Sequence, residues 1–532
     1  MLGNFKRENQ GQFYFIGGGL GSLTGAAYLL RDCGYDGKNI HIIEALPVMG
    51  GSNDACGNPE KGWVMRGERM LNRQTYENFW DILGSIPSID RPEMSVTDEI
   101  LTFSQEKPCI AKARFLDSEG EIMDASSYGL SKAELMQLVN LWKAEESDLD
   151  DVTIADWFDE DFFKTIFWYA YEATFAFQPW SGVAEFRRYT LRFWHLILRL
   201  ITCKGVSLTP HSQYESIIEP LMKVLTDAGV DFIYNTAATD LDFAETDGIT
   251  VTGIHTLTDG KIGYIQLSEG DYVVATLGCM TDNATFGDAN TPAVLDTSYP
   301  MSATLWKNIA DRKEGLGDPD KFFTHPDKSA WMSFNCTFKG NTFMDWLQAY
   351  THNKPGEGLS STFVEHPWIM ELRAQMPGFF RNEPEGYSFL WMCAFNSYAQ
   401  GKHIPKSEFD CTGMEILEEI LQSLPMDEIT RQKCREEVVA AIPVAMPYID
   451  AQFLPHAVGD RPAVVPAGST NLGFTGQFCE IPEDVVFTEE YSVRASRMAV
   501  YQLLGMKKEV APIKPIRYDV RMLLAALPQY LK

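Results

Sequence analysis

The sequence predicts an α/β protein whose first domain is built on a parallel sheet. The stretch "FYFIGGGLGSLTGAAYLL" (13–30) places a buried apolar strand before a glycine cluster and an amphipathic helix. A second apolar run, in "NIHIIEAL", ends at Glu44, and a late glycine-containing strand, "GSTNLGFTGQF", leads toward another helix. Strand, turn, helix and strand in this order form the β-α-β unit of a doubly wound sheet.

The glycine cluster predicts a dinucleotide site. In the frame G-x-G-x-x-G the chain has Gly17, Gly19 and Ser22, so a small polar residue stands in the third position. Glycine lets the backbone approach a ligand closely, and the helix beginning near Leu20 directs free N–H groups at a phosphate. Glu44 follows at close to the ~20-residue spacing of the acid that binds a ribose hydroxyl. The alternative is a structural turn, with Glu44 merely ending a strand.

Composition narrows the class of protein. The chain has 532 residues, 45% of them hydrophobic, which suits two or three globular domains. A net charge of −28 argues against nucleic-acid binding. We find no signal peptide and no uncharged apolar stretch of about 18 residues, so we expect a soluble, cytoplasmic protein. The ten cysteines show no C-x-x-C pair, and we expect no metal site.

The order of patterns suggests five discontinuous segments. They are a first nucleotide-binding part (1–80), a helical substrate region with an aromatic-rich wall (81–215), a return to the nucleotide domain (216–300), a substrate domain with a lid (301–440), and a segment that completes the cofactor site and ends in helices (441–532).

Local signals support individual elements. "SKAELMQLVNLWKAEE" (131–146) opens with a Ser-x-x-Glu capping box, and 487–505 reads as a helix closed by glycine. Alternating residues in "GVDFIYNTAATDLDF", "GITVTGIHTL" and "GDYVVATLGCM" predict strands, the last of which returns to the first sheet near Gly278. The aromatic-dense region 162–200 is either a cavity wall or simply core.

Several long stretches carry a resemblance. They are "GGGLGSLTGAAYLLRD", "IHIIEALPVMGGS", "RGERM", "DEDFFKTIFWY", "FAFQPWSGVAEFRRYTLRF", "MPYIDAQFLP", "GDRP" and "VFTEEYSVR". Together they resemble the oleate hydratase family, also called myosin-cross-reactive antigen proteins, over nearly the whole chain. These are FAD-containing fatty acid hydratases.

The resemblance implies a fold and a reaction. The fold would be an FAD-binding, Rossmann-like flavin domain of the glutathione-reductase type, with a substrate domain and a mostly helical lid region. The reaction would add water across a cis double bond of an unsaturated fatty acid such as oleate or linoleate, with no net redox change. Beside the fingerprint residues, we assign further positions to FAD: Gly51, Ser52, Arg66, Arg69, Gly278, Gly476 and Glu480.

The resemblance also names a proton donor. The family tyrosine falls on Tyr189 in "EFRRYTLRF". A phenol with a pKa of about 10 is protonated at neutral pH and can donate to an alkene. The neighbouring Arg187, Arg188 and Arg192 would stabilise its anion or bind a carboxylate, and we expect Arg187 and Arg188 to contact the substrate. The alternative for Tyr189 is a core tyrosine.

The family loop that activates water is altered. The pattern R-G-G-R-E-M corresponds here to Arg66-Gly67-Glu68-Arg69-Met70-Leu71, so Met70 occupies the glutamate position. A thioether cannot accept a proton from water. Glu68 either takes over as the base in another loop conformation or is a surface residue. The substrate-contacting pattern T-x-N-R-Q-P-H is also only partly kept in "MELRAQMPGFF", with Pro377 retained and Gly378 in place of the histidine.

Three functions therefore remain open. The leading one is a fatty acid hydratase with Tyr189 as proton donor and Glu68 as base. The alternatives are a redox or isomerising flavoenzyme on fatty acids (a double-bond isomerase, desaturase or amine-oxidase-like enzyme) and a flavin- and lipid-binding protein without hydratase activity. Peripheral membrane contact for substrate uptake and a homodimer are compatible with each.

Overall fold

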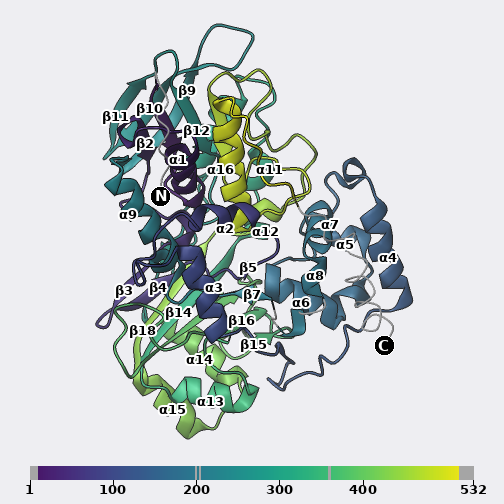
Figure 1. Ribbon diagram of the computed structural model, residues 1–532. Helices are drawn as coiled ribbons and strands as arrows, with labels where there is room; N and C mark the ends of the chain where they lie inside the picture. The colour runs from purple at the N-terminus through teal and green to yellow at the C-terminus, as the bar shows by residue number, and fades with distance from the viewer. Residues whose placement is uncertain (1–9, 198–199, 203–204, 358–360, 514–532) are drawn as a thin grey trace.

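Two sheets lie end to end in the computed structural model, with a group of helices beside them (Figure 1). The structure describes residues 10–197, 200–202, 205–357 and 361–513. The part that contains the first and last strands of the chain carries the nucleotide fingerprint, and the larger sheet is formed mostly by residues 285–446.

The first sheet has five parallel strands in the order β19-β12-β1-β2-β8. Their bounds are β1 Phe13–Ile16, β2 Ile40–Ile43, β8 Asp231–Ile233, β12 Tyr272–Thr276 and β19 Leu472–Thr475. The helices that pack beside it are α1 Leu20–Asp32, α9 Glu219–Asp227 and α16 Glu489–Leu503. Every residue of β1 is buried, which explains its unbroken apolar run. The predicted α/β class and β-α-β unit are confirmed.

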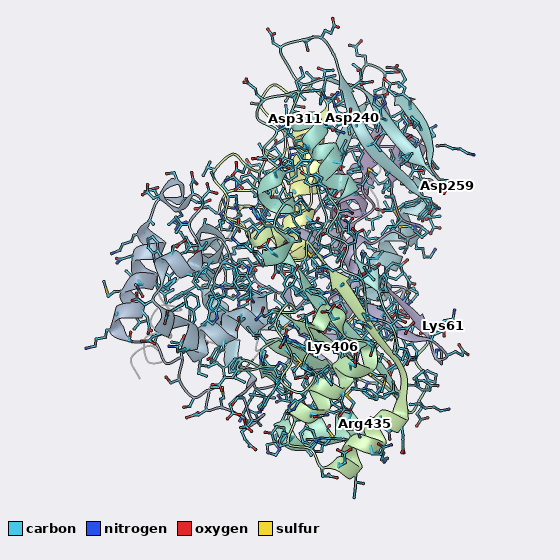
Figure 2. All side chains as sticks on the ribbon, turned by 180° about the vertical axis from the view of Figure 1, so that it is seen from behind. Lys61, Asp240, Asp259, Asp311, Lys406 and Arg435 are labelled. Atoms are coloured by element: carbon cyan, nitrogen blue, oxygen red, sulfur yellow. The ribbon has the colours of Figure 1, made fainter. Side chains whose placement is uncertain are left out.

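A small antiparallel sheet extends this end of the molecule. It consists of β9 Thr236–Phe243, β10 Val251–Thr258 and β11 Lys261–Gln266, with α10 Met301–Ala310 against β9. Figure 2 shows Asp240, Asp259 and Asp311 around this sheet, whereas Lys61, Lys406 and Arg435 lie toward the other end.

The second sheet has seven strands in the order β13-β18-β14-β17-β16-β15-β6. Their bounds are β6 Arg114–Leu116, β13 Thr285–Phe286, β14 Trp331–Lys339, β15 Ser361–Phe363, β16 Met370–Ala374, β17 Tyr387–Ala394 and β18 Val438–Met446. All neighbours are antiparallel except β15 and β6. The predicted segment boundary at 440 falls inside β18, because this strand belongs to the second sheet.

Each face of the second sheet has a different cover. One face packs on α13 Thr342–Thr351, α14 Gly413–Ser423 and α15 Glu428–Glu437. The other receives the hairpin β3 Ala55–Asn58 and β4 Gly62–Met65, whose Met65 N–H donates to Asn335 Oδ1 at 3.0 Å. This hairpin comes from the nucleotide segment, so residues 66–70 are carried between the two sheets.

A group of helices lies beside the sheets, and one of them begins with the predicted capping box. Their bounds are α2 Glu77–Leu83, α3 Val96–Glu106, α4 Lys132–Lys143, α5 Ile154–Trp157, α6 Ile166–Phe175, α7 Val183–Arg192 and α8 Trp194–Ile197, with the short α11 Asp320–Phe323 and α12 Pro326–Ser329 elsewhere. In α4, Ser131 and Glu134 exchange the expected bonds. A short pair, β5 Leu71–Asn72 and β7 Val206–Ser207, links this group to the loop after β4.

In the described part of the aromatic region, residues 162–197 and 200, most rings belong to the core. Phe158 and Phe162 stack at 3.9 Å between ring centroids, and Phe177 packs edge-on against Phe186 at 5.5 Å. A few rings at the inner end instead face a cavity, so both interpretations of this region apply to different faces. Across the described residues we find no helix with the length and apolarity that crossing a membrane requires.

Candidate active site

A cleft of about 560 Å³ opens at the carboxyl ends of the parallel strands. The turn after β1 and the residues after β2 and β12 line it, including Gly17, Glu44 and Gly278. Glu44 is fixed there because its carboxylate accepts hydrogen bonds from Gly18 N (2.6 Å) and Leu46 N (2.8 Å). Burial raises the pKa of Glu44. This is the edge at which open α/β sheets bind ligands.

The glycine turn forms a narrower hollow next to the cleft, which we call the glycine hollow. Gly17 has φ +92° and Gly51 has φ +56°, values that side-chain-bearing residues rarely adopt. A Cβ on Gly51 would lie 3.1 Å from the Gly19 Cα, so the two backbones approach closely. Gly19 precedes α1 without a side-chain cap, which leaves the first N–H groups of the helix available to an anion. Ser22 is buried within α1 and does not line the hollow.

Two arginines expected at the cofactor support this turn. Arg66 donates to Asp54 Oδ1 at 2.8 Å and to Gly51 O at 2.9 Å. Arg69 donates to Ser52 O at 2.9 Å and also lines the glycine hollow. Both guanidiniums therefore fix the backbone of 51–54 from the side of the second sheet.

The structure places Gly476 in the wall of the hollow but does not bring Glu480 there. Glu480 pairs with Arg188 at 2.6 Å instead, because it points toward α7. The carboxylate that lines the hollow is Glu489, in the first turn of α16, which accepts from Asn53 Nδ2 at 2.5 Å. Burial raises the pKa of Glu489 to about 7. The sequence contained a signal for it, since "FTEEY" places acids at the start of the predicted helix.

A separate internal cavity of about 80 Å³, the reaction cavity, brings Tyr189 and Glu68 together. Its wall is assembled from segments far apart in the chain: Glu68, Arg69, Met70, Asn72, Tyr76, Thr174, Phe175, Tyr189, Phe193, Leu196, Val206, Arg373, Phe487 and Thr488. Tyr189 is 1% exposed and donates to Val486 O at 2.6 Å. Burial raises the pKa of Tyr189 well above its ordinary value, so the phenol stays protonated.

Glu68 is partly buried and lines the reaction cavity, which favours the interpretation as a site residue over that as a surface residue. Gln375 Nε2 donates to its carboxylate at 2.5 Å. Burial raises the pKa of Glu68, and the charge of Arg373 opposes that rise. Glu68 also lines a second small space of about 50 Å³, the rear chamber, whose wall includes Trp331, Glu371, Arg373, Trp391 and Cys393.

Three residues, Arg69, Phe487 and Thr488, line both the glycine hollow and the reaction cavity. Arg69 and Phe487 also line the rear chamber. Phe487 has φ +67°, an uncommon conformation for a bulky residue, and its N–H donates to Gln477 Oε1 at 2.5 Å. Such conformations persist where the surrounding structure fixes them, often at functional sites.

The two arginines that precede Tyr189 in the sequence lie away from the reaction cavity. Arg188 is buried and pairs with Glu146 and Glu480, and Arg187 donates to Leu141 O at 3.1 Å. Neither lines the reaction cavity, because both project from other faces of α7 than Tyr189 does. The expected contact of these two arginines with a substrate finds no support in this geometry.

Comparison with known proteins identifies the family. The sequence profile of the MCRA family matches residues 10–501. The chain belongs to the MCRA family. It is 34% identical over 529 residues to an oleate hydratase of Streptococcus pyogenes serotype M49 (strain NZ131), covering 97% of this chain and 89% of that protein. It is also 34% identical over 544 residues to a linoleate hydratase of Lactiplantibacillus plantarum, covering 95% of each.

The fold also occurs in a protein of distant sequence. A crystal structure of an oxidoreductase from Methanosarcina mazei has a TM-score of 0.50 with this MCRA-family chain at 14% identity, covering 92% of this chain and 100% of the other. The family resemblance expected from the sequence is confirmed by the profile and the two hydratases.

Sequence reasoning missed one side of the reaction cavity of this MCRA protein. Arg373 and Gln375 reach Glu68 from β16 and the residue after it. The motif in this segment points to Pro377 and Gly378, which lie outside the cavity wall. No local signal marks Arg373, because an arginine in an apolar strand pattern gains meaning only from what it faces.

Proposed function

We propose that the protein is an FAD-dependent fatty acid hydratase that adds water across a cis double bond of an unsaturated fatty acid. The observation that carries the proposal is the meeting of Tyr189 and Glu68 in one buried cavity. Arg69 and Phe487 place this cavity next to the glycine hollow. The names of the two relatives, oleate hydratase and linoleate hydratase, support the substrate class.

The residues present fit FAD. Glu44 would hold a ribose hydroxyl, and the turn of Gly17, Gly19 and Gly51 with the start of α1 would hold the diphosphate. Gly278 and Gly476 would border the ring system beside the reaction cavity. When bound, FAD would supply a planar ring that organises the site and its electrostatics, most effectively in the reduced state.

The two candidate catalytic residues supply complementary proton transfers. Glu68, when ionised, would take a proton from water while the water oxygen bonds to one alkene carbon. Tyr189 would give its phenolic proton to the other carbon, so one O–H bond of water and the tyrosine O–H bond break as C–O and C–H bonds form. The proton held by Glu68 then returns to the Tyr189 oxygen, and the enzyme is restored with no oxidant consumed.

The cavity sets the pH range of this chemistry. Tyr189 remains protonated because burial raises its pKa. Glu68 must be ionised to act as base, and burial raises its pKa above that of an ordinary carboxyl group. Hydration should therefore fall as the pH drops through this raised pKa, leaving an acid limb above the usual carboxyl range.

Isotope labelling tests the proposal. Oleate and linoleate are incubated with the protein and reduced FAD in water labelled with ¹⁸O. A hydratase places the label in the hydroxyl of the product. A double-bond isomerase gives shifted alkenes without label, and a binding protein returns the substrate unchanged.

Paired loop variants test the base. Glu68→Gln keeps the size and a hydrogen-bond acceptor but cannot take a proton, so hydration should be abolished while fatty acid binding stays intact. Met70→Glu restores the family residue and should raise hydration activity only slightly. If Met70→Glu strongly raises activity and Glu68→Gln has no effect, Glu68 is not the base. Met70 also favours the second candidate, a flavin- and lipid-binding protein without hydratase activity, for which the unchanged chain would itself leave oleate unhydrated.

A further inference from the structure

The carboxylate of Glu68 is held by the second sheet as well as by its own loop. Gln375 donates to it at 2.5 Å, and Arg373 lines both the reaction cavity and the rear chamber beside it. These two residues are two positions apart along the chain, so they present their side chains to the same face of the sheet. The loop after β4 and the β16 segment thus meet at a single carboxylate.

Arg373 is itself anchored firmly. Its Nε and Nη2 donate to Glu371 Oε1 at 3.1 and 3.0 Å, and its guanidinium carbon lies 5.6 Å from the Trp391 ring centroid. The remaining nitrogen, Nη1, takes part in neither hydrogen bond. Glu371 and Trp391 therefore fix the cation while leaving its charge next to Glu68.

The contact joins the two places where this chain departs from the family pattern. One is the loop in which Glu68 replaces a glycine and Met70 replaces the glutamate. The other is the segment 372–378, where only Pro377 of the family pattern is kept.

We infer that Arg373 is a positioning residue that keeps Glu68 ionised for water activation, with Glu371 and Gln375 holding the pair in place. This inference rests on the proposed function, since it gives Glu68 the role of base. Arg373 is not assigned contact with the reacting atoms.

The charges around Glu68 support this role. Burial and Glu371 both raise the pKa of Glu68, whereas Arg373 lowers it. Cys393 Sγ contacts Glu371 Oε2 at 3.5 Å, and Cys109 is a further titratable neighbour of Glu68. The other charged or titratable groups in the walls of the two spaces are Arg66, Arg69, Tyr76 and Tyr189. Without Arg373, two carboxylates would share one buried space, and one of them would take up a proton.

The test is the pH profile of kcat/KM for oleate hydration with reduced FAD. In Arg373→Met, the acid limb of kcat/KM should move to higher pH by at least about one unit. At pH values below the limb, kcat/KM should therefore be tenfold or more lower than in the wild type, and at high pH it should recover. KM should change little, because Arg373 does not bind the substrate. Arg373→Lys keeps the charge and should leave the limb near its wild-type position.

A matched control and a second variant complete the experiment. Arg381→Met removes an arginine paired with Asp90 and Glu219 away from the cavity and should not move the limb. Gln375→Leu removes only a hydrogen bond to Glu68 and should give a smaller upward shift, which keeps the test decisive if Arg373→Met does not fold.

The outcomes separate the two claims. If Glu68→Gln hydrates at the wild-type rate, the base assignment fails and this inference fails with it. If Glu68→Gln is inactive but neither Arg373→Met nor Gln375→Leu moves the limb, the proposed function stands and the positioning role of Arg373 is refuted.

Discussion

The glycine hollow and the reaction cavity differ in what shapes them. The hollow and the adjoining cleft are shaped by glycine backbone in the turns after β1 and β2, where Gly17 and Gly51 have positive φ, and residues from Arg69 to Ser492 complete the wall of the hollow. The reaction cavity draws on residues from 68 to 488, among them the ionisable residues Glu68, Tyr189 and Arg373. Backbone sites depend on conformations that few residues allow, whereas side-chain sites depend on where distant elements meet.

This difference bears on which substitutions each region tolerates. In the loop of the reaction cavity, Glu68 and Met70 stand where the family pattern has glycine and glutamate, while the strand, glycine turn and acid of the nucleotide cleft keep their order. A side-chain site can be rebuilt by substitutions on either facing element. A backbone site loses its shape if one glycine conformation is lost.

The largest effect should come from the reaction cavity. Tyr189→Phe keeps the ring and its packing against Phe175 and Phe177 but removes the phenolic proton. We expect turnover to fall by about two to four orders of magnitude, the usual contribution of a general acid. Steady-state hydration assays measure it, with flavin absorbance and thermal unfolding as controls. Wild-type turnover in this variant would move the proton donor to another residue.

Substitution of Arg188, the residue before Tyr189, should lower stability rather than turnover. Arg188→Met removes the cation that pairs with Glu146 and Glu480, while Arg461 stays paired with the buried Glu185 at 2.7 Å. We expect the free energy of unfolding to fall by about 1.5–3 kcal/mol, the size of a lost hydrogen bond to a charged group. Denaturant unfolding measures this loss. A higher KM for oleate with unchanged stability would contradict it and return Arg188 to the substrate site.

In the nucleotide cleft, Glu44→Ala removes one charged acceptor. Loss of a charge-assisted hydrogen bond to a ribose costs about 1.5–3 kcal/mol, or roughly tenfold to a hundredfold in FAD affinity. Flavin absorbance titration of the apoprotein checks it, and Glu44→Gln, which keeps an acceptor, should lose less. Unchanged affinity would mean that the fingerprint has been assigned to the wrong acid.

The smallest effect tests the backbone character of the hollow. Gly51→Ala forces a Cβ to within 3.1 Å of Gly19 at φ +56° and should cost about 1 kcal/mol, seen as a several-fold loss of FAD affinity. Gly260→Ala is the control, because Gly260 has φ +76° with nothing within 4 Å of its added Cβ. Gly260→Ala should lower stability without changing FAD affinity. Equal FAD affinity in both variants would show that close approach at Gly51 is unimportant.

Much of the first domain could be predicted from the sequence. The strand at 13–16, the helix from Leu20, the strand ending before Glu44 and the helix at 487–505 all follow from short-range patterns, and the structure contains each of them. The reason is physical: apolar periodicity, capping and glycine turns are local properties that neighbouring residues satisfy among themselves.

The sequence by itself determined the family, the parallel sheet and the candidate residues Tyr189 and Glu68. Only the tertiary structure decided what surrounds them. It pairs Glu480 with Arg188 and places Glu489 in the glycine hollow. It also brings Arg373 and Gln375 of the second sheet next to Glu68. Ionisable side chains take their function from the charges and the burial around them, and those are set by elements hundreds of residues apart.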